Sequence, residues 1–149
     1  MTQTSSQSDD FLKSCRASID ILKKYVPWFE ENTGIDHGQT YEELIDKNGK
    51  RSIRNLGSHL GKTFHEFVVE IVDSPFYDLE YFTTLERLQP KFPRILSVVP
   101  DANLQEACAL LTYLIRRERF CDGFHQEAVE DGRFLLVIKR IIEIVETDS

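Results

Sequence analysis

The sequence predicts an all-α protein: a single, mostly helical domain of five to seven helices with its C-terminal helices at the centre. Apolar residues recur at spacings of three and four along most of the chain, which is typical of helices that bury one face. Of the 149 residues, 41% are apolar and 29% are charged, proportions typical of a folded globular protein. A chain of this length can enclose one sizeable core.

The N-terminal segment is expected to be disordered over residues 1–7, which are polar, so the helical domain is expected over residues 8–149. A helical stripe then runs from Phe11 to Val26. Pro27 predicts a kink or a break there, because proline lacks the amide hydrogen that a helix interior uses. Gly34 is expected to end the helical segment, since glycine adopts the left-handed conformation at low cost.

The segment around Asn48-Gly49 has two interpretations. Thr40 and Glu43 form a capping-box pattern, which favours a short helix over Tyr41–Lys47 that ends at this dipeptide. The same dipeptide can instead join two strands of a β-hairpin. The flanking residues lack clean apolar–polar alternation, so the helix is the preferred interpretation and a short β-hairpin near Asn48-Gly49 is the alternative.

Two helices are expected in the middle of the chain. The first is amphipathic, begins near Thr63 and ends before Pro75. The second is short and turns Leu79, Phe82 and Leu85 inward.

The last third of the chain has the most regular pattern. Residues 89–100 contain three prolines, which predict an extended connection leading into this last third of the chain. One apolar stripe follows from Leu104 to Ile115, and a further helix is expected to end at Asp131-Gly132. The final helix has apolar residues on more than one side, which places it in the core.

Net charge and hydropathy limit the classes of function. The formal net charge of −7 argues against a sequence-independent nucleic-acid binder, because such proteins need a basic face. No apolar run approaches the roughly 20 residues that span a bilayer. The N-terminus lacks the basic start and apolar stretch of a signal peptide. We therefore expect a cytoplasmic protein without membrane contact.

The three cysteines, Cys15, Cys108 and Cys121, do not form the pattern of a disulfide framework, because they are odd in number and widely scattered. Each lies among apolar helical positions, where free cysteine behaves as a small hydrophobic residue. Core packing is therefore the preferred interpretation, and a nucleophilic cysteine is the alternative.

The stretch GSHLGKT, Gly57 to Thr63, ends like a phosphate-binding loop. The first glycine of that motif should stand at position 56, which is Leu56, and the preceding segment is too polar to be a buried strand. Thr63 and Glu66 offer a capping box instead. We interpret the stretch as the entry turn of a helix rather than as a nucleotide site.

No metal site and no cofactor are predicted. His65 begins a fragment of a zinc-protease motif, but the second histidine is absent, and Glu70 lies about 140° away around a helix. His37 lies in a polar loop and is expected to be solvated. The basic stretch KNGKRSIR could bind nucleic acid directly, but its acidic flanks favour a solvated loop, so nucleic acid is not an expected partner.

The strongest candidate for a ligand site is the stretch LIRRERFCDGFHQE. Glu118 and Arg119 continue the apolar stripe of the helix before them, and charges on such a stripe need partners. In the structural interpretation, Arg119 pairs with Glu118, another acid or the carbonyls at the helix end. In the functional interpretation, Arg117, Arg119 and His125 line a cleft that binds an anionic ligand. No catalytic set can be assembled from the remaining residues.

The segment ALLTYLIRRERFCDGFHQEAVEDGRFLLVIKRI resembles the C-terminal signature of a small bacterial family of unknown function, numbered 6508. The signature is an apolar helix, an Arg-x-x-Arg-Phe-like turn with a following glycine, a helix, a second glycine and an apolar helix. It falls here on Arg116, Arg119, Phe120, Gly123 and Gly132. The upstream FHEFVVEIVDSPFYDLEYFTTLE is similar to the middle of the family, so the resemblance extends from Gly61 to Val145. It implies a compact, mainly helical bacterial domain and no established activity.

These observations favour a non-enzymatic protein-interaction or regulatory module, of phage or mobile-element origin in one interpretation, that acts on a protein partner or associates with itself. The acidic charge and the lack of a catalytic set motivate this expectation. The aromatic–acidic stretches PWFEE and PFYDLEYF are of a kind that suits an interface, but aromatic segments more often belong to the core, so they add little support. The alternative is a small-molecule or nucleotide-handling protein, including an enzyme, with an anion site at Arg117, Arg119 and His125.

Overall fold

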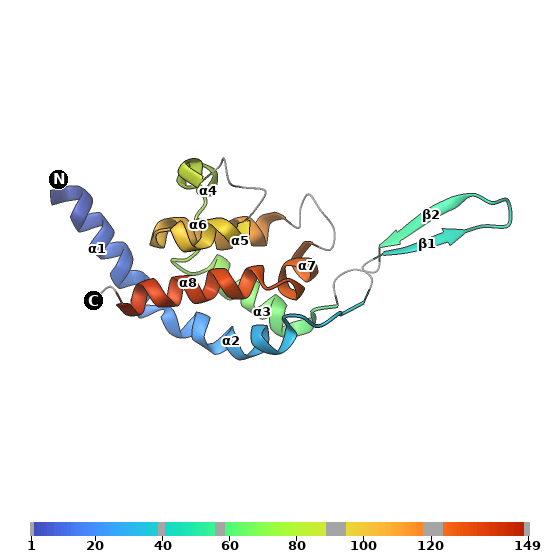
Figure 1. Ribbon diagram of the computed structural model, residues 1–149, viewed down its shortest axis with the longest axis horizontal. Coiled ribbons are helices and arrows are strands. Elements are labelled where there is room, and N and C mark those ends of the chain that lie inside the picture. The colour runs from blue at the N-terminus through green and yellow to red at the C-terminus, as the bar shows by residue number, and fades with distance from the viewer. Residues whose placement is uncertain (1, 39–40, 56–58, 89–94, 118–123, 148–149) are drawn as a thin grey trace.

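The computed structural model describes residues 2–38, 41–55, 59–88, 95–117 and 124–147. The chain folds into a helical body with one two-stranded antiparallel sheet (Figure 1). The elements in chain order are α1 (Thr2–Ala17), α2 (Ile19–Asn32), β1 (Tyr41–Ile45), β2 (Arg51–Asn55), α3 (Gly61–Val72), α4 (Tyr81–Thr84), α5 (Ile95–Val98), the 3-10 helix η2 (Val99–Asp101), α6 (Leu104–Arg116), α7 (Phe124–Glu130) and α8 (Arg133–Thr147). The expected mostly helical class is confirmed. The disorder expected for residues 1–7 stays a prediction.

The helix α8 lies at the centre of the body, where it packs against α6, α2 and α7 (Figure 1). Its buried side chains recur at helical spacing: Phe134, Val137, Ile138, Ile141 and Val145. The neighbouring α6 is buried from Glu106 to Ile115 except at Tyr113, which is half-buried. Helices that are apolar on most sides need neighbours on most sides, which explains why the two occupy the middle of the fold.

Aromatic side chains from three helices pack together in the core. Phe29 of α2, Phe67 of α3 and Phe134 of α8 are each fully buried. The Phe29 ring centroid lies 4.9 Å from that of Phe67 and 5.8 Å from that of Phe134. Phe64 of α3 completes the group, 5.4 Å from Phe134. These contacts join the N-terminal and C-terminal halves of the chain.

The first helical segment breaks earlier than expected. It divides at Ser18, between α1 and α2, whereas Pro27 lies inside α2. Pro27 is on the exposed side of that helix, so the carbonyl that loses its amide partner can bond to water, while Leu22, Tyr25 and Phe29 remain buried on the other side. Gly34, with φ of +81°, follows the helix as predicted.

The prediction of inward-facing residues in α4 is wrong in part. Leu85 is buried, but Leu79 and Phe82 are 78% and 63% exposed. Tyr81 takes the inward position instead, one helical turn before Leu85. The side chain of Asp78 fixes this register, because it accepts bonds from the backbone of Glu80 and the hydroxyl of Thr84.

Two further local expectations fail. The expected extended connection over residues 89–100 contains the short helices α5 and η2 in its described part. The expected capping box of Thr63 and Glu66 is absent, because α3 begins at Gly61 and its N-cap residue, Leu60, makes no side-chain cap. Leu60 is buried, so packing rather than capping sets the start of α3.

The segment after Thr40 forms a β-hairpin, so the preferred interpretation as a helix over Tyr41–Lys47 is wrong and the alternative is confirmed. The turn explains the outcome. Asp46 accepts bonds through Oδ1 from the backbone amides of Asn48 and Lys50, at 2.8 and 2.9 Å, and Gly49 has φ of +79°. A helix of seven residues needs a packed face to offset its nucleation cost, as α7 has, whereas residues 42–47 are exposed and this turn satisfies its amides locally.

Two of the three cysteines are core residues as predicted. Cys15 in α1 and Cys108 in α6 are buried free thiols, and Cys121 lies outside the described residues. Nowhere in the described ranges is a helix both long enough and apolar enough to cross a membrane.

Candidate functional site

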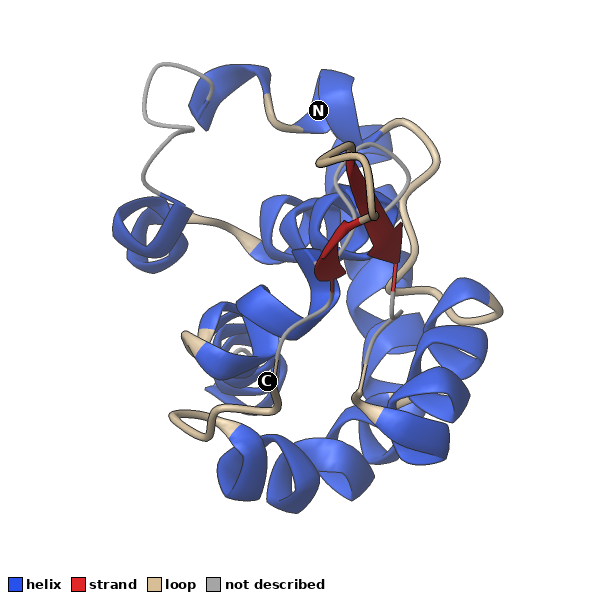
Figure 2. Cartoon of the chain, turned by 90° about the vertical axis from the view of Figure 1, so that its right-hand side faces the viewer, coloured by secondary structure: helices blue, strands red, loops and turns tan. Residues whose placement is uncertain are grey.

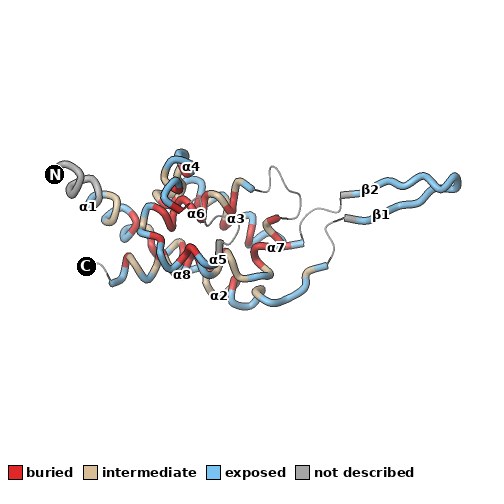
Figure 3. Tube along the Cα trace, turned by 45° about the horizontal axis from the view of Figure 1, so that its top comes forward, coloured by how far each residue is buried: buried red, intermediate tan, exposed pale blue. Residues whose placement is uncertain are grey.

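The hairpin projects away from the helical body (Figure 1), and in Figure 2 it points toward the viewer in front of the helices. Every residue from Glu42 to Arg54 is exposed, on both faces of the ribbon (Figure 3). This includes Ile45 and Ile53, which are 65% and 75% exposed. Over residues 42–54, neither strand packs against the core. A two-stranded ribbon without a packed face is only marginally stable in water. The hairpin therefore offers apolar surface to another molecule, as do Leu79 and Phe82 at α4.

The strand register assigns the hairpin side chains to two faces. Glu43 lies opposite Ile53, and Ile45 lies opposite Arg51. Since side chains alternate along a strand, these four residues lie on the same face as the pair Tyr41 and Asn55. We call the set of four, Glu43, Ile45, Arg51 and Ile53, the isoleucine face. Arg51 Nε lies 3.5 Å from Glu43 Oε1, diagonally across it. The opposite face carries Glu42 with Arg54 and Leu44 with Ser52.

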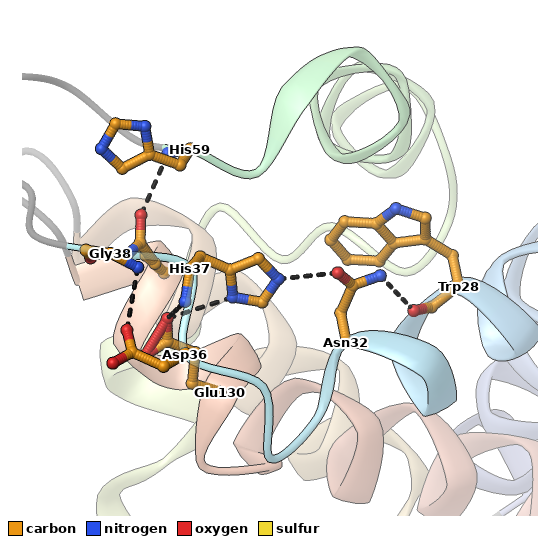
Figure 4. Close-up of polar contacts among 8 residues, drawn as sticks. Trp28, Asn32, Asp36, His37, Gly38, His59 and Glu130 are labelled. Carbon is orange, nitrogen blue, oxygen red and sulfur yellow. Dashed lines mark hydrogen bonds and ion pairs between the residues drawn. The ribbon is translucent and has the colours of Figure 1, made fainter.

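The chain entering the hairpin is fixed to the body by His37 and Glu130 (Figure 4). Glu130 Oε2 lies 2.9 Å from the main-chain nitrogen of His37 and 3.1 Å from its Nδ1. The other ring nitrogen, Nε2, lies 2.7 Å from Asn32 Oδ1, so the imidazole links the end of α2 to the end of α7. The His37 side chain is only 12% exposed, and the expectation that it is solvated is therefore wrong.

A second contact holds both ends of the hairpin segment at once. Gln126 of α7 is buried, and its Nε2 donates to the carbonyl of Gly38 at 2.5 Å, just before β1. Its Oε1 accepts from the main-chain amide of His59 at 3.0 Å, just after β2. One carboxamide thus bonds the chain on both sides of the hairpin, at Gly38 before β1 and at His59 after β2, to the same helix. We call Asn32, His37, Gln126 and Glu130 the hairpin clamp.

The sequence offers little indication of the hairpin clamp. His37 and Glu130 are separated by 93 positions and Gly38 and Gln126 by 88. Gln126 and Glu130 lie in the segment that resembles the family, but neither is one of its signature positions, and Asn32 and His37 lie outside it. Only the unusual burial of a glutamine in a short helix marks the site, and burial becomes visible only once the fold is known.

The charge of the hairpin differs from that of the whole chain. Residues 42–54 carry four basic and three acidic side chains, whereas the chain has a net charge of −7. The basic residues Lys47, Lys50 and Arg51 lie at or beside the turn, and Glu42 and Glu43 lie nearer the body. The ribbon therefore presents both signs of charge around exposed isoleucines.

Of the three residues of the predicted anion site, two lie in the described part of the chain, and their surroundings differ. Arg117 is exposed at the C-terminal end of α6. His125 is half-buried, with Nε2 2.6 Å from the carbonyl oxygen of Ile115 and its ring centroid 5.2 Å from that of Phe64. Arg119, together with Glu118, lies outside the described residues. A joint anion site therefore stays a prediction.

The other candidate chemistry of the sequence has little structural support. The segment before α3 is an exposed antiparallel strand, β2, rather than the buried parallel strand of a phosphate-binding loop. Across the described ranges, no group of three His, Cys, Asp or Glu side chains is placed to hold a metal ion.

A pocket of about 340 Å³ lies between α1, α6 and α8, but its arginine is already bound within the protein. Arg140 donates to the carbonyl of Ala102 from Nε at 3.1 Å and from Nη2 at 2.9 Å. Its Nη1 lies 2.6 Å from Glu143. The guanidinium is thus engaged on each side, so this pocket offers an anionic ligand few donors.

The comparisons with known proteins identify one similarity. The family model described as "Family of unknown function (DUF6508)" matches residues 85–147. This confirms the resemblance over that range, which includes α6, α7 and α8, while residues 61–84 and the hairpin lie outside the match. No curated protein and no solved structure matches the chain.

Proposed function

We propose that this protein is a non-enzymatic protein-interaction module and that the β-hairpin is its contact element. The observation that carries the proposal is the exposure of every residue from Glu42 to Arg54, including both isoleucines. The chain on either side of this ribbon is bonded to the body at Gly38 and His59. Apolar side chains on a projecting element lower the free energy of the system when a partner covers them.

The hairpin clamp supports this proposal because it fixes His37, Gly38 and His59, the described residues on either side of the hairpin, to the body. Gln126 bonds both ends of the hairpin segment, and Glu130 bonds His37 twice. A contact element fixed in advance loses less conformational entropy on binding than a free loop. In the described part of the chain the sheet has two strands, so each strand also keeps one edge with backbone groups available to a partner strand.

A protein fits the hairpin better than a nucleic acid does. Four basic residues on the ribbon are accompanied by Glu42, Glu43 and Asp46, and the whole chain is acidic. Phosphate backbones favour surfaces with a strong excess of positive charge. Mixed charges around apolar side chains are more typical of a protein interface. In this proposal the module works in the cytoplasm, in keeping with its buried free thiols Cys15 and Cys108.

The rival function, a small-molecule or nucleotide-handling protein with a site at Arg117, Arg119 and His125, has weaker support. The imidazole of His125 is occupied by the carbonyl of Ile115 and by aromatic packing. A thermal-shift screen with nucleotides and phosphorylated metabolites tests this rival, which requires stabilisation that Arg119→Ala abolishes.

Site-specific photocrosslinking tests the proposed function. A photoreactive amino acid replaces Ile53 on the hairpin in one variant and Lys13, an exposed residue of α1, in the control. We expect a protein adduct from position 53, none from position 13, and loss of the adduct when Ile45→Asp is added. Irradiation that gives no adduct at position 53 would contradict the proposal, and a nucleic-acid adduct would replace it with the alternative partner class.

A further inference from the structure

We infer that the partner of the isoleucine face is a second copy of this chain, packed face to face about a two-fold axis. The inference rests on the proposed function, because it names the partner of the same hairpin. Its basis is the pattern of charge and apolarity on the four residues of that face, which complements itself.

The register places like residues on diagonals of the isoleucine face. Glu43 and Arg51 occupy one diagonal, where Arg51 Nε and Glu43 Oε1 are 3.5 Å apart. Ile45 and Ile53, the two most exposed large apolar side chains between residues 42 and 54, occupy the other diagonal. The face therefore has an apolar diagonal with an acid on one side and a base on the other.

A two-fold rotation about the isoleucine diagonal makes this pattern complementary to its copy. The rotation places Ile45 on Ile45 and Ile53 on Ile53 of the second copy, so the apolar side chains cover one another. It also brings Glu43 of each copy to Arg51 of the other. A two-fold axis uses the same patch on both subunits, so every favourable contact between unlike residues occurs twice.

Other two-fold arrangements of this face fit less well. An axis parallel to the strands would bring Ile45 onto Arg51 of the copy and Glu43 onto Ile53, which covers charges with apolar groups. An axis across the strands would bring Glu43 onto Ile45, and an axis along the charged diagonal would bring Glu43 onto Glu43. Only the axis along the isoleucine diagonal pairs apolar with apolar and acid with base, so the register itself selects the arrangement.

The opposite face of the hairpin provides a matched control. It carries the same acid and base types, Glu42 and Arg54, but its only large apolar residue is Leu44, which is 40% exposed and lies opposite Ser52. An equal change of charge there alters the net charge of the ribbon by the same amount without touching the inferred contact.

Complementary charge reversals test the inference by analytical ultracentrifugation of the full chain. We expect the wild type to be a dimer, and Glu43→Lys or Arg51→Glu alone to raise the dissociation constant at least about tenfold, because each creates like-charge contacts. An equimolar mixture of the two variants is expected to restore a dimer, since each charged pair across the axis is then again one acid and one base. Glu42→Lys and Arg54→Glu are expected to leave the wild-type dimer unchanged.

The other outcomes separate the inference from the proposed function. A wild type that stays monomeric while the photocrosslinker at position 53 captures a different protein would overturn the inference and leave the proposed function standing. A dimer insensitive to all four variants would also overturn it, because the contact would then lie elsewhere. A monomer with no adduct at position 53 would overturn both. Circular dichroism checks that each exposed substitution leaves the fold intact.

Discussion

His37 and Glu130 form a two-point contact in which one carboxylate oxygen, Oε2, bonds both the main-chain amide and the ring of the histidine (Figure 4). The contact joins segments 93 positions apart and fixes the place where the chain leaves α2 for the hairpin. The position of the chain before the hairpin therefore depends on α7, because Glu130 of that helix supplies the acceptor.

Removing the Glu130 carboxylate is predicted to destabilise the contact that holds His37, just before the hairpin, against α7. Glu130→Ala leaves a largely buried amide and imidazole without their carboxylate, which costs about 1–3 kcal/mol of unfolding free energy. Amide hydrogen exchange over residues 41–55 should accelerate as well. Denaturant unfolding and exchange measured by mass spectrometry check both effects.

Glu127→Ala is the matched control on the same helix. The Glu127 side chain is 69% exposed and lies 3.7 Å from Arg133, so its removal should change stability by no more than about 0.5 kcal/mol. Equal losses in the two variants would show that the contact with His37 has no special role.

The turn of the hairpin is predicted to depend on Gly49. Its φ of +79° lies in the left-handed region, so Gly49→Ala should destabilise the hairpin by about 1–2 kcal/mol although nothing lies within 4 Å of the added methyl group. Gly49→Asn should be milder, because asparagine tolerates this conformation. Exchange rates of the strand amides report the effect, and equal rates in all three proteins would contradict it.

Acid is predicted to weaken the protein through Glu106. Burial raises the pKa of this carboxyl, but Arg87 and the amide of Asn103 outweigh that effect and hold the pKa below its ordinary value. The stabilisation is therefore complete above the ordinary glutamate pKa and is lost as the pH falls below about 4.3 through the lowered value.

Glu106→Gln tests this assignment. The variant should lose about 1–3 kcal/mol at neutral pH, because it loses a charge-assisted pair with Arg87, and should show a flatter stability profile between pH 3 and 5, roughly the range of carboxyl titration. Glu86→Gln, an exposed neighbour of Arg87 in sequence, should keep the wild-type profile. An unchanged pH profile in Glu106→Gln would show that another carboxyl governs acid sensitivity.

The aromatic core is predicted to be the most sensitive part of the body. Phe29 is fully buried and contacts rings from α3 and α8, so Phe29→Ala should cost about 3–5 kcal/mol. Phe82→Ala removes the same side chain from a position that is 63% exposed and should cost far less. Calorimetric melting of both variants measures the difference, and similar losses would place Phe29 outside the core.

Several features of the fold could be predicted because they depend on residues close together in sequence. The stripe of α8 and the glycine stops at Gly34 and Gly132 were visible in local spacing. The resemblance in the last third agrees with the family match over residues 85–147. The hairpin was only an alternative, because its strands lack the alternation that a packed face imposes.

The candidate site could not be predicted in the same way. The hairpin clamp forms between segments 93 and 88 positions apart, and no local pattern marks residues whose partners are so distant. The register of the hairpin, which gathers Ile45 and Ile53 on one face, follows from the turn at Asp46 and Gly49 rather than from apolar periodicity.

Periodicity and backbone preference act within a few residues. They therefore determine the helical class, the central position of the C-terminal helices and the ends of helices at glycine. The folded chain was needed to show that residues 42–54 form an exposed ribbon and that Gln126 and Glu130 bond Gly38 and His37, which precede it. Those outcomes depend on which groups remain unburied and unpaired once the core has formed, and that is a property of the whole chain.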